Sequence, residues 1–236
     1  MVAAGLLWAA PGRAETFYRL DFEGARLAPG SIEDNGKRYT LRRQGGGRVA
    51  RIVRDGGKGS QVLLLSTAPT PAGADRDRSE VQIHSGIAWN RDWFVGLDVM
   101  IPPGTVLSDT WHLLLQCSQP PTGRSPPVSL NLGAEGTLVL VARDDADSYE
   151  PLWTGPLAQG RWVRLVLGLR MGENGRARLW VDGRRVADIR RPLGWAAGER
   201  RCVLKTGIYR GPAATAFALR LDNVSLGAGY ADVARH

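Results

Sequence analysis

The sequence has little cysteine and histidine and no long apolar run, and these shortages exclude several classes of protein. With two cysteines and three histidines in 236 residues, no Cys/His spacing indicates a zinc site. No apolar run approaches the roughly 18 residues that a transmembrane helix needs. Gly 30 and Pro 14 fall short of a low-complexity composition, and 43% hydrophobic residues suffice for a core. We therefore expect a folded protein without a membrane partner and without a metal in its site.

Common catalytic motifs are absent as well. The sequence has no Gly-x-Ser-x-Gly elbow, no P-loop and no dinucleotide-binding fingerprint. It also lacks the run of closely spaced carboxylates that would supply a retaining glycosidase with its two acids. Hydrolases and nucleotide-dependent enzymes are therefore disfavoured.

The charge is strongly positive and is carried by arginine. Lysine and arginine number 31 against 23 acidic residues, which gives +8, and lysine occurs only at Lys37, Lys58 and Lys205. A basic protein favours polyanionic partners such as nucleic acid, anionic lipid or acidic polysaccharide. A general arginine bias is the alternative explanation. Because no basic helix and no aromatic-rich RNA-binding motif accompanies the charge, we expect no nucleic-acid partner.

Residues 1–14 resemble the end of a secretory signal peptide, with Ala14 suited to the cleavage site. A buried first strand is the alternative interpretation. If the signal-peptide interpretation holds, the protein is secreted or periplasmic. Cys117 and Cys202 could then form a disulfide; otherwise they are small buried hydrophobic residues.

The remaining pattern predicts an all-β protein. Short apolar or alternating runs are separated by turn signals about every ten residues, and no segment keeps a helical period beyond two turns. We expect one domain over residues 15–229, an antiparallel β-sandwich or jelly roll, and a C-terminal tail over residues 230–236. The predicted strands are 17–22, 61–66, 93–101, 111–118, 128–132, 137–143, 162–170, 177–181, 184–189, 203–209 and 217–226.

Three segments place polar side chains on one face if they are extended, because alternate residues of a strand share a face. Asn131, in phase with Ser129, is a further candidate for this face. Gly207 would leave a gap between Lys205 and Tyr209. Facing the core we expect Trp111, Leu113, Leu115, Cys117, Cys202, Leu204 and Ile208. Facing outward we expect Arg78, Glu80, Gln82 and His84; His112, Gln116 and Ser118; and Lys205, Gly207 and Tyr209.

These motifs, in this order, resemble the concanavalin A-like polysaccharide lyases, and most nearly the heparin lyase I-like proteins, with glucuronan and alginate lyases as more distant relatives. The resemblance spans about residues 17–227. It implies a β-jelly roll of two antiparallel sheets whose concave face holds an anionic glycan. The motifs that carry it are Arg78-Ser-Glu, the strand with Gln116, Trp180-Val-Asp-Gly, Lys205-Thr-Gly-Ile-Tyr and Asp222-Asn-Val.

The resemblance implies β-elimination at a uronic acid. Gln116 and Arg78 would neutralise the carboxylate, so that charge can develop when C5 loses its proton. Glu80 would orient Arg78. Tyr209 matches the tyrosine that protonates O4 and in some relatives also takes the C5 proton; cations such as Lys205 and Arg78 would favour its phenolate. Candidate substrate-binding residues are Lys205, Asn131, Ser118 and His112.

The expected partner is an acidic polysaccharide, bound by a monomer. The implied reaction requires no cofactor. A structural calcium at Asp222 and Asn223 is an alternative to a simple role for these residues at a strand end.

One departure from the family pattern concerns the base. The relatives have Gln-x-His, whereas this chain has Gln116, Cys117 and Ser118. His84 is our preferred substitute, and His112 is a second candidate. Tyr209 acting alone as base and acid, in a syn elimination, is a third possibility. The fourth is a non-catalytic module of the same fold that only binds anionic glycans.

Overall fold

The structure is a computed structural model and describes residues 16–44, 49–121, 123–143 and 148–234, except for the side chains of residues 84 and 85. The predicted signal peptide, residues 1–14, lies outside this part. Within the described ranges, no helix is long and apolar enough to cross a membrane.

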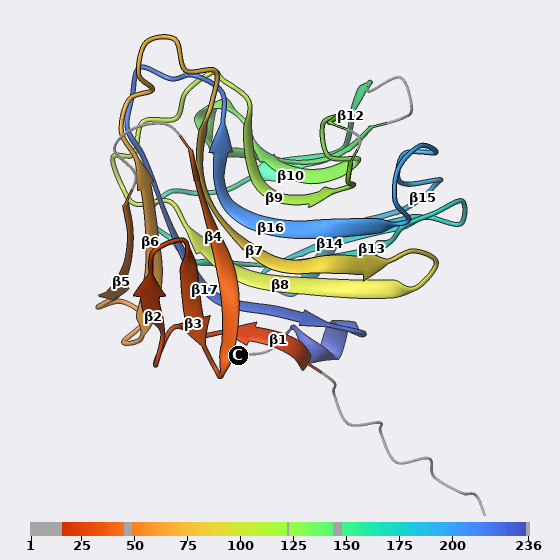
Figure 1. The fold of residues 1–236 in the computed structure, drawn as a ribbon, viewed down its shortest axis with the longest axis horizontal. Helices are drawn as coiled ribbons and strands as arrows, with labels where there is room; N and C mark the ends of the chain where they lie inside the picture. Colours follow the sequence, from red (N-terminus) through yellow and green to blue (C-terminus); the bar gives the residue numbers. More distant parts are fainter. Residues whose placement is uncertain (1–15, 45–48, 122, 144–147, 235–236) are drawn as a thin grey trace, which may run out of the picture.

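The strands form two antiparallel sheets, which we call the back sheet and the groove sheet (Figure 1). In the back sheet the spatial order is β15–β14–β13–β8–β17–β6–β5, with β1 paired to β17; in the groove sheet it is β12–β11–β10–β9–β16–β7–β4–β3–β2. This arrangement confirms the predicted all-β jelly roll sandwich. The back sheet comprises β1 (Thr16–Leu20), β5 (Val49–Arg54), β6 (Gln61–Thr67), β8 (Asp92–Met100), β13 (Val163–Arg170), β14 (Arg176–Val181), β15 (Arg184–Arg190) and β17 (Phe217–Gly227). The groove sheet comprises β2 (Arg26–Ala28), β3 (Ser31–Asp34), β4 (Lys37–Gln44), β7 (Asp77–Ala88), β9 (His112–Ser118), β10 (Val128–Leu132), β11 (Thr137–Arg143), β12 (Tyr149–Pro156) and β16 (Arg201–Arg210).

The core lies between the sheets and follows from the alternation of apolar residues along their central strands. Leu63 and Leu65 of β6, Leu97 of β8 and Leu115 of β9 are buried in one cluster. Burial of each such side chain contributes about 1.5–3 kcal/mol. The sandwich therefore holds the groove sheet rigidly from behind.

Two short 3-10 helices complete the fold, η1 (Ala134–Gly136) and η2 (Tyr230–Asp232). The segment predicted as a C-terminal tail begins with η2. Val233, just after it, is buried against Phe94 and Val166 of the back sheet. Residues 230–234 thus form part of the packed domain, and residues 235–236 lie outside the described part.

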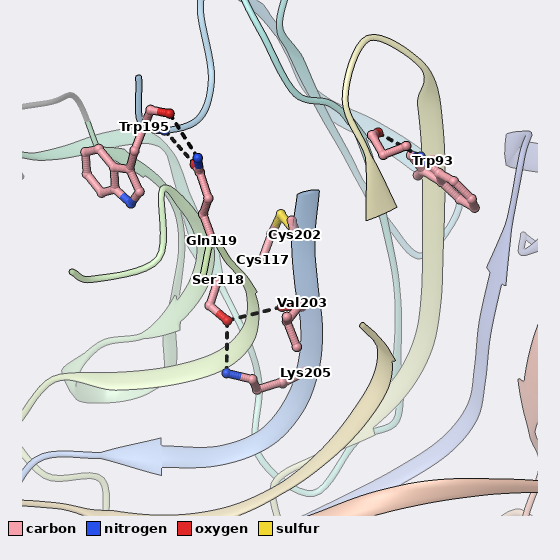
Figure 2. Close-up of a disulfide and its surroundings, with 9 residues drawn as sticks. Trp93, Cys117, Ser118, Gln119, Trp195, Cys202, Val203 and Lys205 are labelled. Atoms are coloured by element: carbon pink, nitrogen blue, oxygen red, sulfur yellow. Dashed lines mark hydrogen bonds between the residues drawn. A yellow bond between two sulfur atoms is a disulfide. The ribbon is translucent and has the colours of Figure 1, made fainter. Parts of the chain in front are cut away.

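Cys117 of β9 and Cys202 of β16 form a disulfide, with their Cα atoms 5.3 Å apart (Figure 2). The sequence left this pairing open. The two cysteines are 85 residues apart in sequence, and their strands are neighbours in the groove sheet. The disulfide therefore fixes two strands that carry predicted site residues.

A bulge in β9 changes which side chains face the groove. Leu130 and Asn131 of β10 lie opposite Leu115 and Leu113, so Leu114 is an extra residue in the ladder. An extra residue reverses the inward and outward alternation beyond it. The prediction that Trp111 and Leu113 face the core is therefore wrong, because both line the groove.

The same bulge buries His112. Its side chain is only 5% exposed, and its ring centroid lies 4.5 Å from that of Phe217 in the back sheet. Burial, together with the nearby Arg210, lowers the pKa of His112 to about 3, so the ring is neutral. The structure thus places His112 in the core and not in the groove, contrary to the predicted outward orientation.

Candidate active site

A groove of about 540 Å³ lies on the outer face of the groove sheet, over β7, β16 and β9. The described residues that line it include no carboxylate. Guanidinium and ammonium groups attract anions and bind carboxylates through charge-assisted hydrogen bonds. The groove is therefore suited to a polyanionic ligand. Its five cationic residues are Arg76, Arg78, Arg124, Arg143 and Lys205.

Tyr209 lies in the groove with its ring held on two sides. It is opposite Arg78 of β7 in the register, and the Arg78 guanidinium lies 4.0 Å from the ring centroid. The Trp111 ring packs edge-on, with centroids 4.9 Å apart and planes at 80°. Arg76 Nη1 donates a hydrogen bond of 3.2 Å to the phenol oxygen. Arg76 thus contacts the phenol oxygen, whereas Arg78 contacts the face of the ring.

Glu80 lies beneath the groove and fixes two of the predicted site residues. Its side chain is 1% exposed. Gln116 Nε2 donates a 2.5 Å hydrogen bond to Glu80 Oε1, and Arg78 Nε forms an ion pair of 3.2 Å with Glu80 Oε2. Burial raises the pKa of Glu80, against the opposing effect of Arg78 and Gln116. Glu80 thus contacts Arg78, as an orienting carboxylate would, and Gln116 keeps a second N–H for a ligand.

Lys205 and Ser118 meet beside Gln116. Lys205 Nζ donates a 2.9 Å hydrogen bond to Ser118 Oγ across β16 and β9 (Figure 2). Burial, opposed by Glu80 and assisted by Arg42 and Arg78, lowers the pKa of Lys205 to about 8. Ser118 is the residue at which the family pattern has histidine. The position at which the family pattern has a histidine side chain is therefore next to the ammonium group of Lys205.

Two other predicted residues do not join this set. Asn131 lies opposite Leu113 on the groove face, but it is buried, accepts a 2.7 Å hydrogen bond from Ser129 Oγ and does not line the groove. His84 of β7 pairs with Leu204 of β16 where the register of the two strands shifts. The side chain of His84 lies outside the described part.

Gly207 does not open a gap in the groove, contrary to the prediction. Its φ is +136°, and a Cβ there would lie 2.5 Å from the Ser79 carbonyl oxygen and 2.8 Å from Leu65. A side chain would therefore clash with β7 and with the core rather than enter the groove. Glycine at this position allows β16 to bulge between Thr206 and Tyr209.

Several groove residues escaped the sequence analysis. Arg76 and Arg124 belong to connecting segments, and Arg143 ends β11. Of these, Arg76 had a usable signal, because it precedes Arg78 by two residues and so shares its face in an extended chain. Trp111, 45% exposed, was assigned to the core because the bulge at Leu114 was not foreseen.

Asp222 and Asn223, the candidate calcium ligands, contact a cation of the protein itself. Lys58 Nζ forms an ion pair of 2.7 Å with Asp222 Oδ2 and another with Asp98. Asn223 Nδ2 donates a 2.9 Å hydrogen bond to Asp98. In the described part of the chain, no three His, Cys, Asp or Glu side chains cluster as metal ligands would.

Comparisons with known proteins agree with this geometry. A family model described as "Polysaccharide lyase" matches residues 30–230. No curated protein sequence matches the chain. An endo-β-1,4-glucuronan lyase from the fungus Trichoderma reesei has a TM-score of 0.67 and 16% identity, over 93% of this chain and 98% of that one. An alginate lyase has a TM-score of 0.56 and 12% identity, over 74% and 77%. The binding domain of botulinum neurotoxin serotype D has a TM-score of 0.57 and 10% identity, over 90% and 48%. At these identities the solved structures show the shared fold alone.

Proposed function

Because the chain belongs to the polysaccharide lyase family, we propose that it cleaves a uronic-acid-containing polysaccharide by β-elimination, with Tyr209 as the residue that transfers the proton. The observation that carries this proposal is that Tyr209, Arg78 and Gln116 line one groove rich in cations and without a lining carboxylate among its described residues. A surface that only binds sugars has no need of a phenol held between two arginines.

The first step would be neutralisation of the C6 carboxylate. Gln116, through its second N–H, and Arg78 would face this group, while Glu80 holds both side chains in place. Neutralisation makes the C5 proton more acidic, because the charge left at C5 spreads into the carboxylate. The fixed donors need no reorganisation as that charge develops.

Tyr209 would then move the proton. In its phenolate form, Tyr209 takes the proton from C5. The electron pair of the C–H bond forms the C4=C5 double bond, and the C4–O4 bond breaks. O4 takes the proton back from the Tyr209 phenol, which restores the phenolate and consumes no water. This single-residue route supports the syn interpretation and requires no histidine at Ser118.

The finer details of the proposal are the substrate and the compartment. The two lyases of the same fold are named for glucuronan and alginate, so we propose a polymer of uronic acids as the substrate. We also propose that the protein acts outside the cytoplasm. The disulfide between Cys117 and Cys202 supports this, because disulfides persist in oxidising compartments.

A binding module without catalysis is the second candidate. The observation in its favour is Ser118 at the position of the family histidine. The two candidates differ in product, because only elimination creates a C4=C5 double bond that absorbs ultraviolet light.

The test is an ultraviolet assay on glucuronan, alginate, heparin, heparan sulfate and other uronate polymers. We expect absorbance to rise with at least one of them. No product from any polymer, together with retained salt-sensitive binding, would establish the binding module instead.

The Lys205 ammonium should make substrate binding pH-dependent. The protonated form binds a carboxylate and the neutral form does not, so affinity is full below the pKa of about 8 and falls above it. Between pH 7 and pH 9 we expect binding of a uronate oligosaccharide to weaken by up to about tenfold. Isothermal titration calorimetry across this range would measure the effect.

The matched control is Lys205→Arg, which keeps the charge and does not titrate in this range. The affinity of this variant for the oligosaccharide should not decline above pH 8. An equal decline in both proteins would show that another group is responsible.

A further inference from the structure

The back sheet carries an unusual row of arginines at one end. Arg170 of β13, Arg176 of β14 and Arg190 of β15 lie directly opposite one another in the register. Their chain neighbours Leu169 and Ala177 belong to the core, so the row is on the outer face of the sheet. Like charges directly opposite on neighbouring strands are destabilising. Folding alone therefore does not explain the row.

Carboxylates compensate the row only in part. Arg170 Nε donates a 2.9 Å hydrogen bond to Asp92, and Arg176 binds both oxygens of Asp188 at 2.7 and 2.6 Å. Arg190, at the exposed end of the row, forms no ion pair with any residue in the described ranges. The row thus keeps a net positive charge at the edge of the sheet.

A cavity of about 380 Å³ opens next to this row. Its remaining walls are Arg191 and the turn residues Glu173, Asn174 and Gly175, so four arginines face one lining carboxylate. Arg191 N donates a 3.1 Å hydrogen bond to the Gly175 carbonyl, and a Cβ on Gly175 would lie 2.3 Å from the Arg191 oxygen. The turn and the end of β15 are therefore in close contact.

This cavity is distinct from the groove. It lies on the back sheet, whereas the groove lies on the groove sheet, and the two share no lining residue. Arg191 forms an ion pair with Glu150 of β12, the edge strand of the groove sheet, so the cavity lies where the edges of the two sheets approach each other. A polymer chain, unlike a single sugar, could contact both places.

We propose that this arginine-lined cavity is a second anion-binding site, which holds carboxylate or sulfate groups of an acidic polysaccharide while another part of the polymer occupies the groove. Guanidinium groups present paired N–H donors that match both of these anions. The proposal rests on the proposed function for the class of ligand, but it predicts binding rather than cleavage.

The test measures polymer binding in a Tyr209→Phe background, in which the polymer stays intact. We compare Arg190→Gln/Arg191→Gln with the charge-matched control Arg51→Gln/Arg54→Gln, whose arginines are exposed on β5 of the same sheet. For long polyglucuronate at low salt, we expect the first variant to bind about tenfold more weakly, with a shallower salt dependence. We expect the control to change by less than about twofold. Arg190→Gln alone guards against misfolding, because Arg190 forms no ion pair among the described residues, and it should show part of the loss.

A glucuronate tetrasaccharide that occupies the groove alone should bind all variants equally. Equal losses in the test and control variants, or equal losses for polymer and tetrasaccharide, would overturn the proposal. A loss of affinity for duplex DNA alone, with polymer binding unchanged, would also overturn the proposal. Binding of inorganic sulfate that Arg190→Gln/Arg191→Gln abolishes, together with unchanged polymer binding in that variant, would assign the cavity to free anions instead. Failure of the lyase function would appear separately, as absence of product from the protein with Tyr209 intact.

Discussion

Replacing Tyr209 with phenylalanine is expected to lower kcat for β-elimination by about 10²–10⁴-fold, the range for loss of a general acid or base, and to change KM by less than about twofold. The substitution removes only the phenol oxygen. The ring keeps its contacts with Arg78 and Trp111, so the groove retains its shape. Steady-state kinetics from the ultraviolet absorbance of the product measure both constants.

Tyr230→Phe is the matched control, since Tyr230 lies in η2 on the back sheet and packs on Trp180. It should leave kcat unchanged. A Tyr209→Phe enzyme with the wild-type kcat would exclude the phenol as the proton carrier. A large rise in KM with kcat unchanged would instead make Tyr209 a binding residue.

Replacing Asp77 with asparagine is expected to lower the free energy of unfolding by about 3–5 kcal/mol. Asp77 and Arg210 are both fully buried, with 3.4 Å between Arg210 Nη2 and Asp77 Oδ2. Without the carboxylate, the buried guanidinium loses its opposite charge and keeps hydrogen bonds to the carbonyl oxygens of Ala68 and Thr215. For a chain of this size the midpoint of thermal unfolding should fall by about 6–20 °C. Calorimetry or circular dichroism would measure it.

The position of this ion pair makes the result relevant to the active site. Asp77 and Arg210 are opposite each other in the register, directly next to the pair Arg78 and Tyr209. The ion pair therefore stabilises the register that brings Arg78 over the tyrosine ring. Glu33→Gln, which breaks an exposed ion pair with Arg38, is the control and should cost less than about 1 kcal/mol. If Asp77→Asn lowered the free energy of unfolding by as little as Glu33→Gln does, the buried ion pair would add nothing to stability.

Strand alternation predicted correctly that Arg78, Gln116, Lys205 and Tyr209 line one face, because the sheet repeats every two residues. It failed at His112 for a specific reason. The extra residue of β9 lies in a run of three leucines, Leu113 to Leu115, where every position is apolar. A change of phase within such a run leaves no trace in the hydrophobic pattern. Only the hydrogen-bond register reveals it.

The rest of the site was beyond sequence analysis for other reasons. Arg124 and Arg143 come from separate parts of the chain, and only the fold brings them to one groove. Strands β4, β5 and β12 were also missed. β4 and β5 are rich in arginine, and β12 is an edge strand interrupted by proline and glycine, so none of them shows a strong alternating pattern.

The extra leucine of β9 has a consequence for how this site could change over generations. Deleting one codon at Leu114 would remove the extra residue, and regular alternation would then keep Trp111 and Leu113 toward the groove and His112 toward the interior. Loss of the bulge without a deletion would instead turn His112 toward the groove and turn Trp111 and Leu113 toward the interior. A comparison of related genes should therefore examine the number of codons in β9 as well as the identity of each residue.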